Sequence, residues 1–170
     1  MLNAAIFLIL PLCLAFAALT DLFTMTIPNR VSLVLFGSFL LIAPFAGLGW
    51  QNIGMSFAAS LTVFSFCFVL FSMNTMGGGD AKLLTASAMW FGFDMSLMEF
   101  MFAVAIVGGI LTIAILLLRS RSQEIMASGL PIPDSLLVAK KVPYGIAIAI
   151  AGLLTYPEAP IVQLAMQHML

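Results

Sequence analysis

Long stretches without a single charged side chain constrain this chain more than any other feature. No Asp, Glu, Lys or Arg occurs in the first 20 residues, in the 49 residues between Arg30 and Asp80, or in the 19 between Glu99 and Arg119. Of the 170 residues only 8% are charged and 63% are hydrophobic, with a mean hydropathy of +1.19. A soluble domain needs roughly 25% charged residues for its hydrated surface. The sequence therefore predicts an integral membrane protein and excludes both a soluble globular fold and a disordered chain.

The charged residues mark where the chain can leave the hydrocarbon core, and their spacing predicts the number of spans. A membrane helix needs about 20 mostly apolar residues. The uncharged stretches are residues 1–20, 31–79 (two spans), 83–93, 100–118 and 142–157. The fourth has only 11 residues, so it either continues past Asp94 toward Leu97, with Asp94 near the outer headgroups, or enters the bundle only partway. Ile27-Pro-Asn29 is predicted to be a turn that opens the second span, with Asn29 as a candidate cap, and residues 47–52 a turn before the third. We therefore expect an all-α bundle of about six transmembrane helices, in one domain covering residues 1–170.

The basic residues predict the orientation of this bundle. With six spans, all of them fall in the loops after the first, third and fifth: Arg30, Lys82, Arg119, Arg121, Lys140 and Lys141. By the positive-inside rule this face is cytoplasmic and both termini are outside, with Trp90, Phe91 and Phe93 at the outer interface. The first span is expected to be retained although Ala15-Phe-Ala17 resembles a cleavage site, because no basic residue precedes it. The net charge of −1 provides no basic surface for nucleic acid.

Two aspartates lie at span boundaries on the predicted cytoplasmic face. Asp21 follows the first span and Asp80 opens the fourth, so the predicted topology brings both to one membrane depth. An acidic side chain in a span costs about 2.5–3.5 kcal/mol at the centre and less near the ends, so it is by default a functional candidate. Two structural alternatives stay open. Asp80 can be the N-cap of the fourth helix, and Asp21 can be a solvated loop residue.

Three glycines precede Asp80, and a lysine follows it closely. Gly77, Gly78 and Gly79 permit positive φ angles and close backbone approach, so they are candidates for holding an extended substrate against the turn. A phosphate-binding loop is excluded because no Gly-Lys-Ser/Thr follows the glycines. Lys82 either extends toward the headgroups or holds an aspartate in its charged form, and it is a candidate positioning residue.

Two carboxylates brought together supply a well-defined kind of catalysis. When they share a site, like charges prevent both from ionising, so one keeps a proton while the other acts as a base. The base activates water, and the acid protonates the carbonyl oxygen or the leaving amide. We therefore expect no cofactor, and no metal either, since the sequence has no His-Glu-x-x-His or further carboxylate cluster. Cys13 and Cys67 form no Cys-x-x-Cys pair and are interpreted as buried hydrophobic residues.

Three motifs, in this order, resemble the type IV prepilin peptidase family. They are Asp21 followed by Ile27-Pro-Asn29, Gly77-Gly-Gly-Asp80 followed by Ala81-Lys82, and Val142-Pro-Tyr-Gly145 followed by Ile146-Ala-Ile-Ala149. The match extends over essentially the whole chain, and within the family the chain is similar to the small branch that serves Flp-type, or tight-adherence, pili. Thr20 precedes the first aspartate where presenilin-like enzymes have Tyr, which also favours the prepilin branch.

The resemblance implies an aspartic endopeptidase of the bacterial inner membrane. Members of the family cut the short basic leader from prepilins or pseudopilins on the cytoplasmic side, typically after a glycine that precedes the apolar helix of the pilin. Carried over by position, Asp21 and Asp80 are the catalytic pair, and Gly77 and Gly79 are the glycines of the Gly-x-Gly-Asp motif. The implied partners are a prepilin substrate, the lipid bilayer and the pilus assembly machinery.

Features that the sequence lacks argue against some other activities, and two alternative functions stay open. Larger family members carry a cytoplasmic domain with paired Cys-x-x-Cys motifs and also N-methylate the mature pilin; this chain has two cysteines in no such pair, so neither a zinc domain nor methyltransferase activity is expected. One alternative is a non-catalytic membrane subunit of a pilus or secretion assembly, with the aspartates as helix caps. Another is a small proton-coupled transporter, which is disfavoured because the two halves show no convincing internal repeat.

Overall fold

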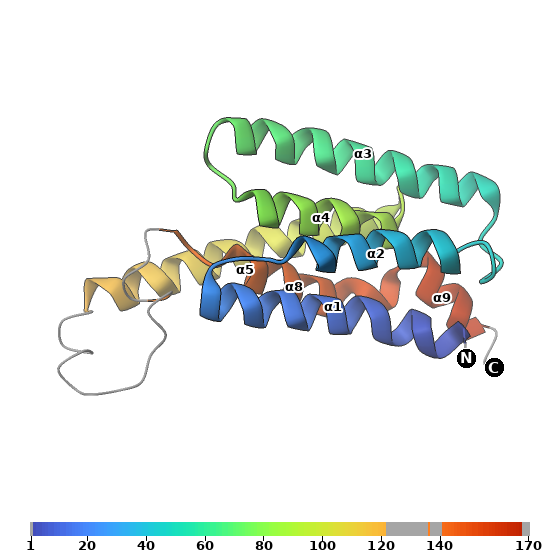
Figure 1. Ribbon diagram of the computed structural model, residues 1–170, viewed down its shortest axis with the longest axis horizontal. Helices are drawn as coiled ribbons and strands as arrows, with labels where there is room; N and C mark the ends of the chain where they lie inside the picture. Colours follow the sequence, from blue (N-terminus) through green and yellow to red (C-terminus); the bar gives the residue numbers. More distant parts are fainter. Residues whose placement is uncertain (1, 122–135, 137–140, 168–170) are drawn as a thin grey trace.

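All of the regular structure in the described part of the chain is helical. The computed structural model describes residues 2–121, Leu136 and residues 141–167. The elements, labelled as in Figure 1, are α1 (Leu2–Thr24), α2 (Asn29–Ile42), α3 (Trp50–Ser72), α4 (Gly78–Phe91), α5 (Met95–Ser120), α8 (Tyr144–Thr155), the 3-10 helix η1 (Tyr156–Glu158) and α9 (Pro160–Gln167). The predicted all-α fold is confirmed for these residues. Lys140, one of the basic residues used to predict the orientation, lies outside them.

Three helices are long and apolar enough to cross a membrane: α1, α3 and α5. A fourth crossing results if the bent pair formed by α8 with η1 and by α9, which turns by 43°, is taken as one span. The predicted count of about six spans is not confirmed, because α2 and α4 have only 14 residues each. At 1.5 Å per residue each of them rises about 21 Å, less than the roughly 30 Å hydrocarbon core. Counting uncharged residues could not show this, since the count treats turn and helical residues alike.

The helices alternate in direction, so their connections lie at the two ends of one bundle (Figure 1). The start of α1 and the end of α9 lie together at one end. The turns from α1 to α2 and from α3 to α4 lie at the other, which we call the aspartate end because Asp21 and Asp80 stand beside them. The Lys and Arg residues of the described part all belong to the aspartate end: Arg30, Lys82, Arg119, Arg121 and Lys141. The sorting of basic residues to one end therefore holds without the six-span count.

α4 is the central helix of the bundle. It packs between α2 and α3 and also contacts α8, and most of its side chains from Ala81 to Phe91 are buried. A helix that is buried around most of its circumference needs no polar face. It ends at Gly92, whose φ of +67° is easily adopted only by glycine. Because Asp80 lies in the first turn of α4, its carboxylate is placed in the middle of the aspartate end.

A buried stripe determines which face of α1 meets the bundle. Leu10, Leu14 and Ala17 recur every three or four residues with no exposed surface, and Asp21 continues the same stripe. α8 packs against α1 and α5 with small residues; a Cβ added to Gly152 would come within 2.5 Å of Leu14. Small residues at helix contacts allow the close packing on which helix association in lipid depends. The stripe therefore turns Asp21 toward α8.

The turn between α2 and α3 differs from the prediction. The sequence predicts it at residues 47–52, whereas the structure has it at residues 43–49. Pro44 cannot donate the backbone hydrogen bond that would continue α2. Trp50 already begins α3, so the polar residues that follow it, predicted to lie in the turn, are helical.

Trp90 and Phe91 were predicted to lie at the outer interface, and this prediction is wrong. They are 1% and 0% exposed, and the Trp90 indole N–H donates to a backbone carbonyl of α2 at 3.0 Å. The Phe91 ring stacks on Phe100 of α5 with centroids 4.3 Å apart, and Phe39 of α2 meets Trp90 edge to face at 5.9 Å. These rings fill the end of the bundle opposite the aspartates. We call this region, defined by Phe39, Trp90, Phe91 and Phe100, the aromatic end.

Candidate active site

Asp21 lies in the last turn of α1 and is only 5% exposed. Its Oδ2 accepts a hydrogen bond from the backbone N–H of Gly145 at 2.7 Å, across 124 residues of sequence. Gly145 is the second residue of α8, and the first N–H groups of a helix lack partners within it and carry the positive end of its dipole. Asp21 therefore caps a helix other than its own. The alternative of a solvated loop residue is wrong.

Gly145 fits this position because it has no side chain. A Cβ added there would come within 2.8 Å of Asp21 Oδ2 and within 2.8 Å of Ile27 Cδ1. Ile27 comes from the turn between α1 and α2, so the start of α8 is pressed against both the helix that carries Asp21 and the turn that follows it. The close approach of three chain segments at this point holds the Asp21 carboxylate in one position.

Asp80 is the third residue of α4, and Gly77 occupies the N-cap position. The structural alternative that made Asp80 the N-cap is therefore wrong. The Asp80 carboxylate folds back onto the N–H of Gly77, and a Cβ on Gly77 would come within 2.7 Å of Oδ2. Asp80 Oδ1 is buried and has no hydrogen-bond partner within the described residues. A buried oxygen without a partner is costly, so this atom has most to gain from a bound water or substrate.

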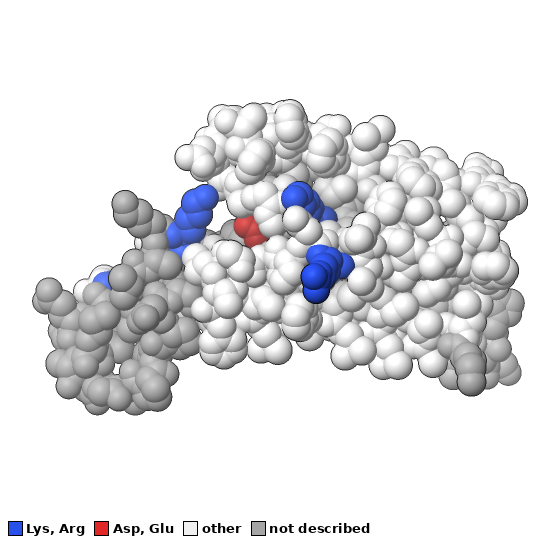
Figure 2. Space-filling view, viewed as in Figure 1, with Lys and Arg blue, Asp and Glu red and all other residues white. Residues whose placement is uncertain are grey.

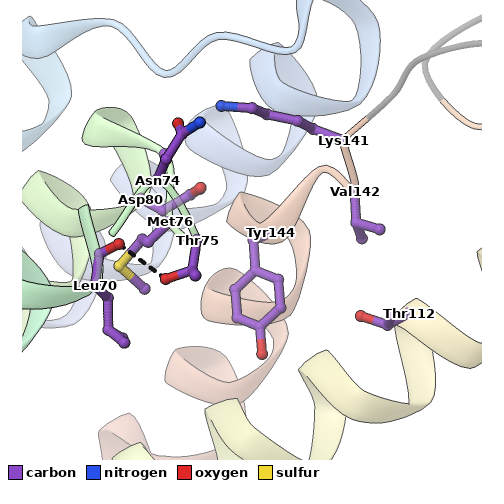
Figure 3. A pocket seen from close by; sticks show the side chains of 10 residues that line it. Leu70, Asn74, Thr75, Met76, Asp80, Thr112, Lys141, Val142 and Tyr144 are labelled. Atoms are coloured by element: carbon purple, nitrogen blue, oxygen red, sulfur yellow. Dashed lines mark hydrogen bonds between the residues drawn. The ribbon is translucent and has the colours of Figure 1, made fainter. Parts of the chain in front are cut away.

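Both carboxylates line one cavity of about 330 Å³ at the aspartate end. Asp80 also lines a second cavity of about 460 Å³, bounded by the end of α3, by α5 and by the residues leading into α8 (Figure 3). The cavities have four lining residues in common: Gly77, Asp80, Lys141 and Val142. Asp80 therefore stands between two spaces, and an extended chain that occupied both would pass directly over its carboxylate.

The glycines before Asp80 contribute space and not unusual backbone angles. Positive φ among the described glycines occurs in other turns, so the φ > 0 that these three permit is not used. A Cβ on Gly78 would come within 3.3 Å of the Phe71 ring, and one on Gly79 within 3.2 Å of Ile27. The missing Cβ atoms let the start of α4 lie directly against α3 on one side and the α1–α2 turn on the other.

Two residues other than glycine adopt left-handed backbone angles beside the cavities. Met25, with φ of 53°, follows α1 and lines the smaller cavity; Asn74, with φ of 58°, follows α3 and lines the larger one. Asn tolerates this region because its short polar side chain bonds locally, whereas Met does not. Residues held in such conformations cost about 1–3 kcal/mol and cluster at functional sites. The strain at Met25 lies one helical turn beyond Asp21.

The two lysines nearest the aspartates have different positions. Lys82 lines neither cavity; its ammonium donates to Asn29 Oδ1 at 3.0 Å and joins the start of α2 to α4. Asn29 is not the cap of α2, since Pro28 holds that position. Lys141 lines both cavities with Asp80, and Figure 3 shows it extending across the top of the larger one toward Asn74. In the sequence Lys141 served only to predict the orientation, because no spacing relates it to Asp80.

Tyr144 forms a wall of the larger cavity (Figure 3). A Cβ added to Gly108 of α5 would overlap its hydroxyl, so this glycine leaves the space in which the ring lies. The motif Val142-Pro-Tyr-Gly145 thus supplies a cavity wall and the N–H that donates to Asp21. In the sequence the motif stood out only as part of a resemblance. The continuation of the apolar stripe of α1 to Asp21 is the signal that could have predicted a buried partner.

The fold and this site define a class of protein: a helical membrane protein in which three helix ends bring two carboxylates to one cavity. The sequence profile of the type IV leader peptidase family matches residues 8–113, and the chain belongs to this family. No curated protein and no solved structure matches the chain. The family predicted from the motifs is confirmed, and with it a membrane protease of the leader-peptidase type. The matched region contains Asp21 and Asp80 but ends before α8.

Metal ligands are sparse in this site. Across the parts of the chain that the structure describes, no three His, Cys, Asp or Glu side chains gather closely enough to hold a metal ion. The polar groups that meet at the cavities are two carboxylates, backbone N–H groups, hydroxyl and amide side chains and one ammonium. This set suits acid–base chemistry on a bound peptide.

Proposed function

We propose that the protein is an aspartic endopeptidase that removes the leader of Flp-type prepilins or pseudopilins, with Asp21 and Asp80 as its catalytic pair. The observation that carries the proposal is that these carboxylates, from α1 and α4, line one cavity at the end of the bundle. Membership of the leader peptidase family supplies the reaction class, and the pair supplies groups able to perform it.

The reaction follows from two carboxylates that share one proton. A water molecule between them gives a proton to the ionised carboxylate as its oxygen attacks the scissile carbonyl carbon, while the protonated carboxylate donates to the carbonyl oxygen. The tetrahedral intermediate collapses when the proton taken from water passes to the amide nitrogen and the C–N bond breaks. The carboxyl group that had donated recovers its proton as the carbonyl re-forms. The products are a leader with a new carboxylate and a pilin with a free amine.

The two aspartates have different surroundings within this scheme. Asp21 accepts the N–H of Gly145 with one oxygen and lines the smaller cavity. Asp80 has an unpartnered Oδ1 and stands between the two cavities, where an extended substrate would place its scissile bond. Asp21 is thus the fixed partner, and Asp80 is the one that gains hydrogen bonds when water and substrate bind.

The orientation of the protein in the bacterial inner membrane follows from its basic residues. Those in the described part of the chain gather at the aspartate end, which the positive-inside rule assigns to the cytoplasm. Leaders are then cut on the cytoplasmic side, and the start of α1 and the end of α9 face the periplasm. The protein acts as one domain without N-methyltransferase activity.

The purified full-length protein tests this proposal with a synthetic prepilin, cleavage being read by mass spectrometry. Asp21→Asn and Asp80→Asn should each abolish cleavage, because Asn keeps the shape but transfers no proton. Asp94→Asn is the matched control: Asp94 caps α5 at the opposite end by accepting the Met95 N–H, and Asn is an equally good cap. Cleavage by either site variant at a rate near wild type would contradict the mechanism. A different result would favour a non-catalytic subunit: the purified wild-type protein does not cleave the prepilin, although cells that contain the protein process it.

A further inference from the structure

A groove of about 460 Å³ lies on the outside of the bundle, apart from the two cavities that hold the aspartates. α4 forms its floor, and α2 and α3 form its walls. Its lining residues are Asn29, Arg30, Ser32, Leu33, Phe36, Phe64, Lys82, Thr85 and Ala86. The groove carries no carboxylate, but Asn29 also lines the smaller catalytic cavity. It therefore borders the candidate active site without being part of it.

The groove is cationic at one end and apolar at the other. Arg30 and Lys82 lie at its aspartate end, and Figure 2 shows basic side chains over the first turns of α2 and α4. From Arg30 the lining continues along α2 past Leu33 to Phe36, roughly 9 Å away at 1.5 Å per residue. There the Phe36 ring meets Phe57 of α3 edge to face at 6.0 Å and closes the groove.

The cationic end has hydrogen-bond donors to spare. Lys82 has three N–H donors, one of which is used by Asn29. The exposed Arg30 guanidinium makes no hydrogen bond to any described residue. An anion that accepted from these groups would be held by charge and by directed hydrogen bonds together.

We propose that this groove binds one anionic phospholipid, with its phosphate between Arg30 and Lys82 and an acyl chain along Leu33 and Phe36. The occupant is a lipid because the groove lies on an apolar outer face of a membrane protein, where Leu33 and Phe64 are 71% and 47% exposed. It is anionic because the mouth holds two cations and no acid. A basic leader peptide is repelled by the same charges, so the groove is not a continuation of the substrate path.

Lipid retention by the full-length protein in detergent tests this site without any need for catalysis. Native mass spectrometry after titration with phosphatidylglycerol or phosphatidylcholine of identical chains should show one phosphatidylglycerol retained preferentially. Each groove cation should contribute about fivefold to that preference, so Arg30→Gln with Lys82→Gln should weaken retention roughly 25-fold. Arg121→Gln removes the same charge at the end of α5, outside the groove, and should leave retention unchanged. Equal retention of both lipids, or equal effects of the groove and control variants, overturns the proposal.

A second pair of variants tests the apolar half of the groove. Leu33 and Leu41 are both 71% exposed on α2, but only Leu33 lines the groove. Leu33→Ala should weaken phosphatidylglycerol retention at least about threefold and Leu41→Ala should not. Free glycerol phosphate, which has the headgroup charge without the chains, should not displace the bound lipid at equal concentration. Displacement by glycerol phosphate, or equal behaviour of the two leucine variants, would show a bare anion site and overturn the lipid assignment. Thermal unfolding of each variant excludes loss of the fold as the cause.

Discussion

The two ends of the bundle use aspartate in different ways. At the aromatic end, Asp94 is exposed and accepts the N–H of Met95 at 2.7 Å, so it caps its own helix. At the aspartate end, Asp21 is 5% exposed and caps α8, whose N–H donor lies 124 residues away. A cap within one helix stabilises that helix alone. A cap between helices also fixes where a carboxylate stands relative to a second helix, which is what a catalytic group requires.

The two ends of the bundle also differ in the residues that pack there. The aromatic end is filled by rings, among them Phe91 and Phe100, which are stacked with centroids 4.3 Å apart. At the aspartate end glycines take the contact positions: an added Cβ would be tight at Gly78 and Gly79 and would clash at Gly145. Small residues allow helix ends to converge while their polar groups border cavities. The aromatic end therefore supports the fold, and the aspartate end contains the candidate site.

The largest expected effect distinguishes Asp21 and Asp80, which are proposed to be catalytic, from Asp94, which caps a helix. Asp21→Asn with Asp80→Asn should lower prepilin cleavage by about 10³-fold or more, scarcely beyond either single variant, because groups that act as a unit are not additive. Asp94→Asn should leave the rate unchanged. Single-turnover cleavage by the two single variants, the double variant and Asp94→Asn measures this. Losses that multiply in the double variant would show that the two carboxylates act independently.

Membrane orientation gives the next contrast between the ends. In a protein with Cys13 and Cys67 replaced, a cysteine at position 25 should resist an impermeant thiol reagent added to the outside of intact cells, and one at position 50 should react. Position 25 lies in the turn at the aspartate end, and Trp50, at the other, is 80% exposed. Reversed labelling would contradict the proposed cytoplasmic site.

Gly145 tests whether the interhelical cap positions Asp21. Gly145→Ala places a Cβ within 2.8 Å of Asp21 Oδ2 and should lower the rate by about 10²-fold, since a displacement near 1 Å has effects of that size. Gly109→Ala on α5 is the matched control, because nothing lies within 4 Å of the added Cβ. It should be neutral or slightly stabilising. Equal rates for the two alanine variants would show that the cap does not orient Asp21.

The sequence predicted the helical class and the aspartates because both follow from local chemistry. A chain with so few charged residues cannot form a hydrated surface and must fold in lipid. A carboxylate beside an apolar stretch is easily recognised in any sequence. The number of spans was not predictable in this way. The length of α2 depends on Pro44, and that of α4 on Gly92, whereas charge spacing reports neither. A short helix such as α4 can remain stable because it is surrounded by other helices.

The partners of the aspartates were less predictable than the aspartates themselves. Gly145 reaches Asp21, and Lys141 reaches the cavities, only because α8 packs against α1. This packing depends on the small residues of α8 and the buried stripe of α1, and no local spacing reports their contact. Lys82 illustrates the reverse error. Its closeness to Asp80 in sequence suggested a role beside the carboxylate, but its ammonium donates to Asn29 and lines neither cavity that holds Asp80.

Stability should be more sensitive at the aromatic end. Phe100→Ala removes a fully buried ring that stacks on Phe91 and should lower the free energy of unfolding by about 3 kcal/mol. Phe93→Ala, at a site 48% exposed near the same end, should change it little. Thermal unfolding in detergent measures both, and cleavage below the transition should be retained by each. Loss of cleavage by folded Phe100→Ala protein would show that the aromatic end contributes to the candidate site and does not only stabilise the fold.

The smallest expected effect distinguishes the two lysines of the aspartate end. Cleavage should depend on pH as a bell, with apparent pKa values that belong to the aspartate pair. Lys141 lines both cavities beside Asp80, so its positive charge favours the ionised carboxylate. Lys141→Met removes that charge and should move the acidic limb toward higher pH, by roughly half a unit. Lys82→Met removes an equal charge that is bonded to Asn29, and it should leave the profile in place. Rate measurements over the pH range in which cleavage rises and falls compare the two variants. An equal shift in both variants would mean that the pair responds to the overall charge of this end, and no shift in either would remove Lys141 from the site.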